Sequence, residues 1–233
     1  MASGAVTGLK MHVSRDGFAI IPKVIPSTEI TGLLSELEIS SLTRSRAGFR
    51  HAMRHEAVAM IAHDPRLCGL AAESLGSTAI PFRATLFDKS PSSNWLVVWH
   101  QDTALPICER REVAGWGPWS VKDGIAYAHA PASALESVVA LRVHLDDSNA
   151  DNGPLRVLAG THDKGVLEDD AIHSLASEIA PVDCLVSAGG VIAMEPLIVH
   201  ASSKSRSEEP RRVLHIEYAS SFDLPGGLKL AIA

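Results

Sequence analysis

The sequence predicts an α+β protein that is mainly β, with a jelly-roll or sandwich core and helices on its N-terminal side. From about residue 79 to about residue 222, short apolar runs rich in β-branched and aromatic residues alternate with clusters of Pro, Gly, Asn and Asp. Before that, over about residues 1–78, apolar side chains recur with helical spacing. We expect a single domain over residues 1–233, in which a helical flank precedes the β core.

Two helices are predicted in the N-terminal flank. The first covers residues 28–40, whose apolar side chains share one helical face, and Ser27 is its expected N-cap. The second runs through residues 56–76. Pro65 should interrupt it, because proline cannot donate a backbone hydrogen bond, and Gly76 should end it.

Six segments of the later region are predicted to contain strands, because apolar and β-branched residues dominate them and turn residues separate them. They are residues 79–89, 94–102, 137–147, 154–160, 190–202 and 211–220. We expect residues 162–180 to form a loop with a short helix. Residues 108–129 are expected to form a long irregular segment of the kind that often serves as a binding loop or lid.

The composition excludes several classes of protein. Hydrophobic residues make up 46% and charged residues 21%, as in an ordinary globular domain, and the formal net charge of -6 does not predict nucleic-acid binding. No apolar run is long enough to span a membrane. The three cysteines, Cys68, Cys108 and Cys184, are far apart and odd in number, so we expect no disulfide framework and a reducing, cytoplasmic location. The sequence does not indicate an oligomeric state.

Histidine and carboxylate residues at the ends of predicted strands indicate a metal site. Iron(II) that activates O2 needs two histidines and one carboxylate on one face, with other coordination positions open. His100 and Asp102 form a His-x-Asp pair, in which residues i and i+2 point to the same side of a strand. His200, at the end of a later apolar run, is the expected third ligand.

The His-x-acid pattern alone does not single out this pair, because it occurs three times. The other two pairs are His144 with Asp146 and His215 with Glu217. The first is also explained by a strand that ends before the turn at residues 146–153. The second is also explained by a hydrogen-bonded pair on a barrel wall.

The wider context resembles a known family. Residues 87–102 (FDKSPSSNWLVVWHQD), 141–162 (LRVHLDDSNADNGPLRVLAGTH) and 189–218 (GGVIAMEPLIVHASSKSRSEEPRRVLHIEY) are similar, in that order, to the phytanoyl-CoA dioxygenase family, and the similarity spans about residues 80–220. The resemblance implies a double-stranded β-helix, also described as a cupin-like jelly roll. It also implies an enzyme that uses iron(II), 2-oxoglutarate and O2 to hydroxylate a small molecule, with release of succinate and CO2.

Carried over residue by residue, the resemblance assigns His100, Asp102 and His200 to the metal and to catalysis. Arg211 matches the arginine that holds the far carboxylate of 2-oxoglutarate, and Ser202 matches the serine that assists it. Gln101, between the first two ligands, is a further candidate to approach the co-substrate. Without the resemblance, a surface ion pair of Arg211 with Glu208 or Glu209 is the favoured explanation, and Arg206 and Arg212 are rivals for the carboxylate. Arg212 has the opposite strand parity, so only one of the two points inward.

Departures from the family pattern bear on the substrate. Nothing in the sequence indicates a CoA-nucleotide site, and Arg142 stands where members of the family that act on acyl-CoA thioesters often carry tryptophan. A small, polar, anionic substrate is therefore expected, with a set of candidate contacts that comprises Arg83, Trp116, Lys122 and Arg142. Trp116 and Trp119 form either a lid or a core anchor. We expect Lys89 to be a solvated turn residue and His162 to be a structural hydrogen-bonding residue.

Two alternatives stay open at this stage. A cupin-type metalloenzyme that does not use 2-oxoglutarate would share the histidines but not need Arg211. A non-catalytic metal- or ligand-binding sensor would keep the fold without turnover. A halogenase is disfavoured, because such enzymes replace the carboxylate ligand with a small residue and this chain has Asp102.

Overall fold

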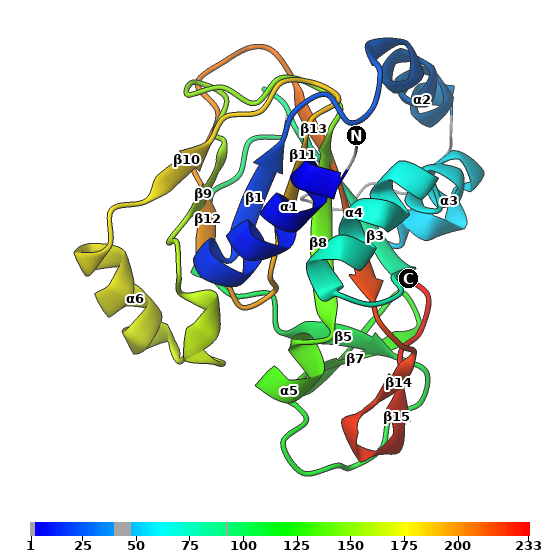
Figure 1. Ribbon diagram of the computed structural model, residues 1–233, viewed down its shortest axis with the longest axis vertical. Helices are drawn as coiled ribbons and strands as arrows, with labels where there is room; N and C mark the ends of the chain where they lie inside the picture. Colours follow the sequence, from blue (N-terminus) through cyan, green and yellow to red (C-terminus); the bar gives the residue numbers. More distant parts are fainter. Residues whose placement is uncertain (1–2, 40–47, 92) are drawn as a thin grey trace.

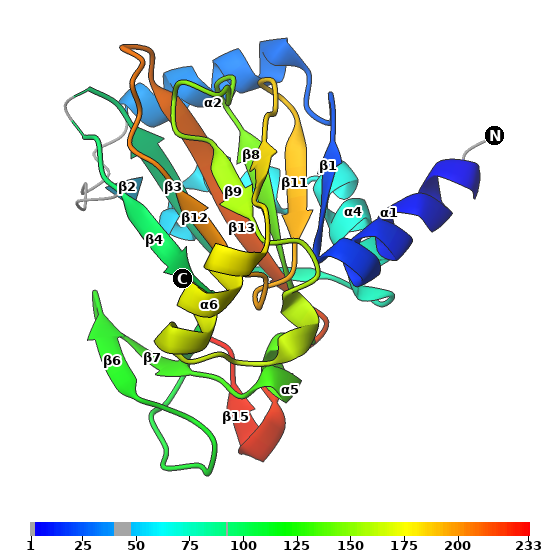
Figure 2. The ribbon, with the colours of Figure 1, turned by 90° about the vertical axis from the view of Figure 1, so that its left-hand side faces the viewer.

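Two antiparallel β-sheets face each other in the computed structural model, which describes residues 3–39, 48–91 and 93–233 (Figures 1 and 2). The strands of the larger sheet, in spatial order, are β1 Phe18–Ile21, β11 Val191–Met194, β8 Val138–His144, β13 Arg211–Ala219, β3 Ile80–Lys89 and β2 Gly48–Phe49. Those of the smaller sheet are β10 Val182–Cys184, β9 Leu155–Val157, β12 His200–Ser202 and β4 Val97–His100. The fold is the cupin-like jelly roll that the sequence predicts.

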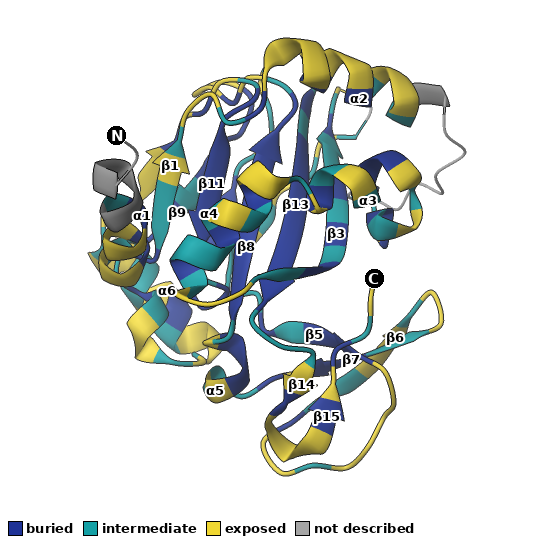
Figure 3. Ribbon diagram, turned by 45° about the vertical axis from the view of Figure 1, so that its right-hand side comes forward, coloured by how far each residue is buried: buried dark blue, intermediate teal, exposed yellow. Residues whose placement is uncertain are grey.

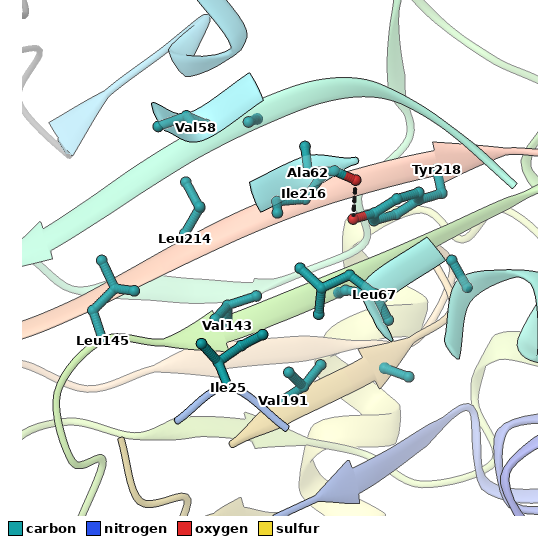
Figure 4. Packing of buried hydrophobic residues seen from close by; sticks show 14 of the residues in the cluster. Ile25, Val58, Ala62, Leu67, Val143, Leu145, Val191, Leu214, Ile216 and Tyr218 are labelled. Carbon is teal, nitrogen blue, oxygen red and sulfur yellow. Dashed lines mark hydrogen bonds between the residues drawn. The ribbon is translucent and has the colours of Figure 1, made fainter. Parts of the chain in front are cut away.

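Helices cover the outer face of the larger sheet (Figure 1). They are α1 Ser3–Asp16, α2 Ser27–Ile39, α3 Glu56–Ala62 and α4 Pro65–Leu75. Three even-numbered residues of β13, Leu214, Ile216 and Tyr218, pack against them in the largest apolar cluster, and the Tyr218 hydroxyl donates to the Ala62 carbonyl at 2.9 Å (Figure 4). Since side chains alternate along a strand, the odd-numbered residues of β13 face the space between the sheets.

The predicted breaks in the helices are confirmed, with one correction. Pro65 separates α3 from α4, and Gly76 caps α4 with a φ of 67° in the left-handed region. The N-cap prediction for Ser27 is wrong by one residue, because the Pro26 carbonyl already accepts from the amide of Ile30. Ser27 therefore lies inside the first turn of α2, whose last predicted residue, Ser40, lies outside the described residues.

Each predicted strand segment contains a strand, and the 190–202 segment contains two. β11 ends at Met194 and β12 starts at His200, on the other sheet. The segment 162–180 holds the expected short helix, α6 Asp169–Glu178, after a 3-10 turn at His162–Lys164. Residues 108–129, predicted to be irregular, contain instead the hairpin of β6 Trp119–Lys122 and β7 Ile125–His129.

The hairpin belongs to a small third sheet beyond the end of β4 (Figure 2). Its remaining strand is β5 Ala104–Ile107, and short elements complete the chain around it: α5 Ala132–Leu135, β14 Asp223–Leu224 and β15 Leu228–Lys229, with 3-10 turns at Ala52–Arg54 and Pro225–Gly227. A second apolar cluster, which includes Trp116, holds this sheet against the rest of the molecule.

Burial is greatest in the middle of the larger sheet, where every residue of β8 is buried (Figure 3). A third apolar cluster joins residues of β8, β9, β10 and β11 and fills part of the space between the sheets. No helix in the described part of the chain is long and apolar enough to cross a membrane.

Candidate active site

The three predicted metal ligands meet at the edge of the smaller sheet. His100 is the last residue of β4, Asp102 follows two residues later, and His200 begins β12 directly opposite His100 in the antiparallel register. The Nε2 atoms of His100 and His200 lie 3.7 Å and 3.5 Å from the Asp102 carboxylate oxygens, and the three potential ligand atoms all lie within 4.8 Å of one another. Among the described residues, this is the group of histidine and carboxylate side chains that fits a metal ion.

Backbone contacts orient both imidazole rings. Nδ1 of His100 lies 2.9 Å from the Val98 carbonyl, and Nδ1 of His200 lies 2.9 Å from the Ile198 carbonyl. Because a carbonyl only accepts, each Nδ1 carries the hydrogen and each Nε2 lone pair faces Asp102. Metal-binding histidines use this arrangement, in which one ring nitrogen is anchored and the other coordinates.

The electrostatics of the group also fit a divalent cation. Burial lowers the pKa of His200 to about 4, so its ring is neutral at physiological pH. Burial would raise the pKa of Asp102, but His200 and His100 hold it well below its usual range. Two neutral imidazoles and one carboxylate form the donor set that non-haem iron(II) takes in oxygenases.

A cavity of about 170 Å³ opens from these three residues into the space between the sheets. Its lining is apolar along the sides and basic at the end away from Asp102. The lining residues are Phe87, Lys89, Trp95, Val97, His100, Asp102, Arg142, Leu155, His200, Ala201, Ser202 and Arg211.

The basic end of the cavity is built by two paired strands. Arg211 on β13 stands opposite Lys89 on β3 in the register, and both side chains are buried. Lys89 Nζ donates to Ser202 Oγ at 2.8 Å, and Arg211 Nη2 lies 3.4 Å from the same oxygen. Arg211 Nε donates to the Asn152 carbonyl, but its Nη1 is buried without a partner. An arginine nitrogen left unpaired in a cavity is suited to a carboxylate ligand.

The comparison with known sequences decides the family. The profile described as phytanoyl-CoA dioxygenase matches residues 13–213. The chain belongs to the phytanoyl-CoA dioxygenase family. It is therefore an oxygenase of the class that depends on iron(II) and 2-oxoglutarate, as its sequence predicts.

Two characterised proteins are similar over most of their length. L-proline trans-4-hydroxylase from Streptomyces griseoviridis is 25% identical over 93% of this chain and 87% of its own length. Ectoine dioxygenase from Bordetella bronchiseptica is 23% identical over 88% of this chain and 72% of its own length.

Solved structures share the fold. The epimerase SnoN from nogalamycin biosynthesis, in complex with Fe3+, alpha ketoglutarate and nogalamycin RO, superposes with a TM-score of 0.72 at 20% identity, over 98% of this chain and 95% of its own. EctD from S. alaskensis with bound Fe superposes with a TM-score of 0.68 at 17% identity, over 94% of this chain and 77% of its own.

The rivals of Arg211 lie outside the cavity of this family member. Arg206 is exposed and pairs with Asp151 at 2.8 Å. Arg212 points to the other face of β13, as its parity predicts, and its Nε and Nη2 bind the Asp146 carboxylate. Arg211 contacts Asn152 and Ser202, not the nearby glutamates that the surface explanation requires.

The other two His-x-acid pairs do not form metal groups. Asp146 is occupied by Arg212, and His144 is fully buried with both ring nitrogens unpartnered. Glu217 pairs with Arg83, and Nδ1 of His215 lies 3.2 Å from Arg142 Nη1. His215 and Glu217 thus lie on the barrel wall, but each binds an arginine and not the other.

The contacts of Gln101 differ from the expectation that this side chain approaches the co-substrate. Its Nε2 donates to the carbonyls of Gly165 and Leu197, and its Oε1 accepts from the amide of Leu167. The amide nitrogen and oxygen are thus engaged by backbone groups of two loops, an arrangement that favours a structural role for Gln101. Its hydrogen bonds join the chain at the end of β4 to the loops that contain Gly165 and Leu197.

Lys89 is the residue that the sequence interpretation missed. It is 1% exposed and not a solvated turn residue, and burial next to Arg211 and Arg142 lowers its pKa to about 7. The sequence did carry one signal for this burial, which is the alternation of side chains along a strand. Lys89 shares a strand face with Phe87 and Arg83, so a strand long enough to include it places its side chain inside.

The remaining substrate candidates divide into two groups. Arg142 lines the cavity. Arg83 donates to Glu217 and to the Ala104 carbonyl, and Lys122 Nζ lies 4.5 Å above the Tyr127 ring on the hairpin side of Asp102. Trp116 is buried in the apolar cluster under the hairpin, which favours the core-anchor alternative, and it does not line this cavity.

The neighbouring Trp119 packs on the edge of that cluster with Arg110 over its ring, so both tryptophans serve as anchors. His162 contacts the Ser14 carbonyl through Nε2, in keeping with its expected structural role.

Proposed function

We propose that this oxygenase hydroxylates a C–H bond of a small polar metabolite, with conversion of 2-oxoglutarate and O2 to succinate and CO2. One observation carries the proposal: the triad of His100, Asp102 and His200 opens into a cavity whose far end presents Arg211, Lys89 and Ser202. A two-carboxylate co-substrate needs a metal at one end and a hydrogen-bonding cation at the other.

In this proposal, His100, Asp102 and His200 hold the iron through two Nε2 atoms and a carboxylate oxygen. The bound iron supplies the O2 activation that no side chain can perform. Arg211 and Lys89 hold the far carboxylate. Ser202 Oγ accepts from both side chains and donates to the Gly153 carbonyl, so it assists by orienting the two cations. Phe87, Val97 and Leu155 keep water away from the reacting atoms.

The substrate side is proposed to lie between Asp102 and the β6–β7 hairpin. Burial and the charges of Arg83 and Arg50 lower the pKa of Lys122, so the potential at this position is positive. In the described part of the chain, no carboxylate forms an ion pair with Lys122. These features favour an anionic group on the substrate, and the relatives named for L-proline and ectoine support a small molecule.

The proposed function and a cupin-type metalloenzyme that does not use 2-oxoglutarate predict different results in one experiment. The purified protein is loaded with iron(II) without oxygen and titrated with 2-oxoglutarate. We expect a weak visible charge-transfer band that saturates at one equivalent per chain. Absence of both the band and 2-oxoglutarate binding would favour a metalloenzyme that does not use this co-substrate.

The reaction itself is tested by a metabolite screen in air. Each candidate is scored for stimulated formation of succinate and for a product heavier by one oxygen atom. Binding of iron and 2-oxoglutarate without turnover on any candidate would favour a sensor. Stimulation only by neutral apolar compounds would contradict the anionic substrate.

A further inference from the structure

Arg142 is a buried arginine that forms no ion pair with an acid among the residues that the structure describes. It lies in the middle of β8, is 7% exposed, and lines the cavity next to the triad. Its Nη1 lies 3.2 Å from His215 Nδ1, its guanidinium stands 5.3 Å from the Phe87 ring centre, and its Nε is buried with no partner. Burying a charged group without a counterion costs several kcal/mol, so a position of this kind needs an anion to complete it.

Among the cavity-lining residues that the structure describes, three are basic and one is acidic. Lys89, Arg142 and Arg211 stand against Asp102 alone. Two of the basic residues, Lys89 and Arg211, flank Ser202 and are assigned above to the far carboxylate of 2-oxoglutarate. Arg142 remains without an assigned anion.

The position of Arg142 along the cavity indicates which anion it meets. It pairs in the register with His215, four residues along β13 from Arg211, a separation of about 13 Å at about 3.3 Å per residue. Its charge lowers the pKa of His200 at the metal end and those of Lys89 and Arg211 at the other end. Arg142 therefore lies between the triad and the far-carboxylate site, beside the path that a bound 2-oxoglutarate follows.

We propose that Arg142 binds the carboxylate next to the keto group of 2-oxoglutarate, so that the cavity holds this dicarboxylate by positive charge at both ends. The inference rests on the proposed function, since it takes 2-oxoglutarate as the co-substrate. It has one consequence that the far-carboxylate site alone does not have: the metal-free protein binds 2-oxoglutarate with an affinity that depends on Arg142 as well as on Arg211.

The first experiment measures 2-oxoglutarate binding to the metal-free protein by calorimetry in the presence of a chelator. We expect the wild type to bind. Arg142→Gln should weaken binding by about 30-fold or more, the lower end for loss of a buried charge pair. Arg156→Gln is the matched control, because Arg156 lies on β9 with its guanidinium 5.1 Å from the Trp99 ring, outside the cavity. No binding by the wild type without metal would overturn the proposal.

The second experiment assigns the end of the ligand, with the protein loaded with Ni2+ as a redox-inert metal. The probes are 2-oxoglutarate and 2-oxovalerate, which keeps the keto acid and has a methyl group in place of the far carboxylate. Arg142→Gln should weaken both probes by the same factor, whereas Arg211→Gln should weaken only 2-oxoglutarate. If Arg142→Gln weakens only 2-oxoglutarate, Arg142 belongs to the far carboxylate. If it weakens neither, Arg142 binds the substrate or only supports the fold. Either result contradicts the proposal.

Two measurements keep these outcomes separate from other failures. Arg142→Lys keeps a positive charge and should recover part of the affinity that Arg142→Gln loses, and thermal unfolding of each variant shows that it is folded. If the Ni2+-loaded wild type binds neither probe, the proposed function fails. If it binds both and Arg142→Gln matches it, only the role of Arg142 fails.

Discussion

Single side chains of this protein gain their chemical character from burial in a cavity with few acids. Lys89 is the clearest case. The sequence FDKSP places it one residue before a turn, where a lysine is normally hydrated, yet the strand continues to Lys89 and turns its side chain inward. The sequence alone does not reveal this, because the decisive neighbour, Arg211, lies more than a hundred residues away and becomes adjacent only through strand pairing.

The pKa of Lys89 leads to a prediction at this scale. Since burial lowers that pKa to about 7, the ammonium is present below pH 7 and lost above it. A dicarboxylate binds the charged form better, so 2-oxoglutarate affinity should fall as pH rises from 6 to 8.5. Lys89→Met should bind more weakly at pH 6 and lose most of the pH dependence. Calorimetry across this range checks the prediction, and an unchanged slope in the variant would assign the titration to another group.

Arg211 and Arg206 give a second prediction. Arg211→Ala should weaken 2-oxoglutarate binding by roughly 2–5 kcal/mol, because it removes a charge-assisted contact to a buried carboxylate. Arg206→Ala should change it little, since Arg206 is exposed and pairs with Asp151. Titration of the charge-transfer band measures both. The reverse ranking would move the carboxylate site to Arg206.

The three His-x-acid pairs give a third prediction. His100→Ala and Asp102→Ala should abolish iron-dependent turnover and the rise in melting temperature that a bound divalent metal produces. His144→Ala should keep metal binding while lowering stability, because it leaves a cavity in a fully buried strand. His215→Ala should also keep metal binding. A metal found at either of those two histidines, by anomalous scattering, contradicts the assignment of the triad.

Secondary-structure elements were predictable where the sequence carries local signals. Pro65 and Gly76 mark the ends of α3 and α4 because each acts on its own backbone. The hairpin at 119–129 also carries a local signal, which the sequence interpretation missed. Asp123 and Gly124, both with positive φ, form the two-residue turn between β6 and β7, and Asp-Gly is typical of such hairpins. The strands themselves were hard to recognise, because β6 is half exposed and its apolar pattern is weak. The break between β11 and β12 was missed although Glu195 and Pro196 interrupt the apolar run, and a proline is not tolerated inside a central strand. The change of sheet at this point could not be read from the sequence.

The turn between β8 and β9 supports the basic end of the cavity, which gives a prediction at the scale of elements. Gly153 has a φ of 67°, and an added Cβ would lie 2.3 Å from the Ser203 carbonyl, to which Lys89 donates. Gly153→Ala should therefore destabilise the protein by about 1–3 kcal/mol and also weaken 2-oxoglutarate binding. Gly160→Ala is the matched control, because its φ is 75° and its Cβ meets nothing within 4 Å. Denaturant unfolding and calorimetry compare the two. Equal effects would rule out the contact with Ser203.

At the scale of the whole molecule, the jelly roll and the triad could both be predicted, for different reasons. Strand and turn composition indicate the class of fold, and the order of motifs along residues 80–220 indicates which histidines matter. The sequence shows only in part which basic residues point into the cavity and which of them are paired with an acid. Parity separates Arg211 from Arg212, but no local pattern shows that Arg83 pairs with Glu217 while the Nε of Arg142 has no partner among the described residues.

The hydrogen bonds of Gln101 have a consequence for the order in which the chain refolds. They join the His100–Asp102 strand end to the carbonyl of Leu197, 96 residues away, and to the loop at Gly165. Contacts so distant in sequence form late, because the entropy of closing a long loop must be overcome first. The helices and local hairpins therefore acquire structure before the two halves of the triad are fastened together. In stopped-flow refolding, far-ultraviolet circular dichroism should recover before metal affinity does, and Gln101→Ala should slow the second event more than the first.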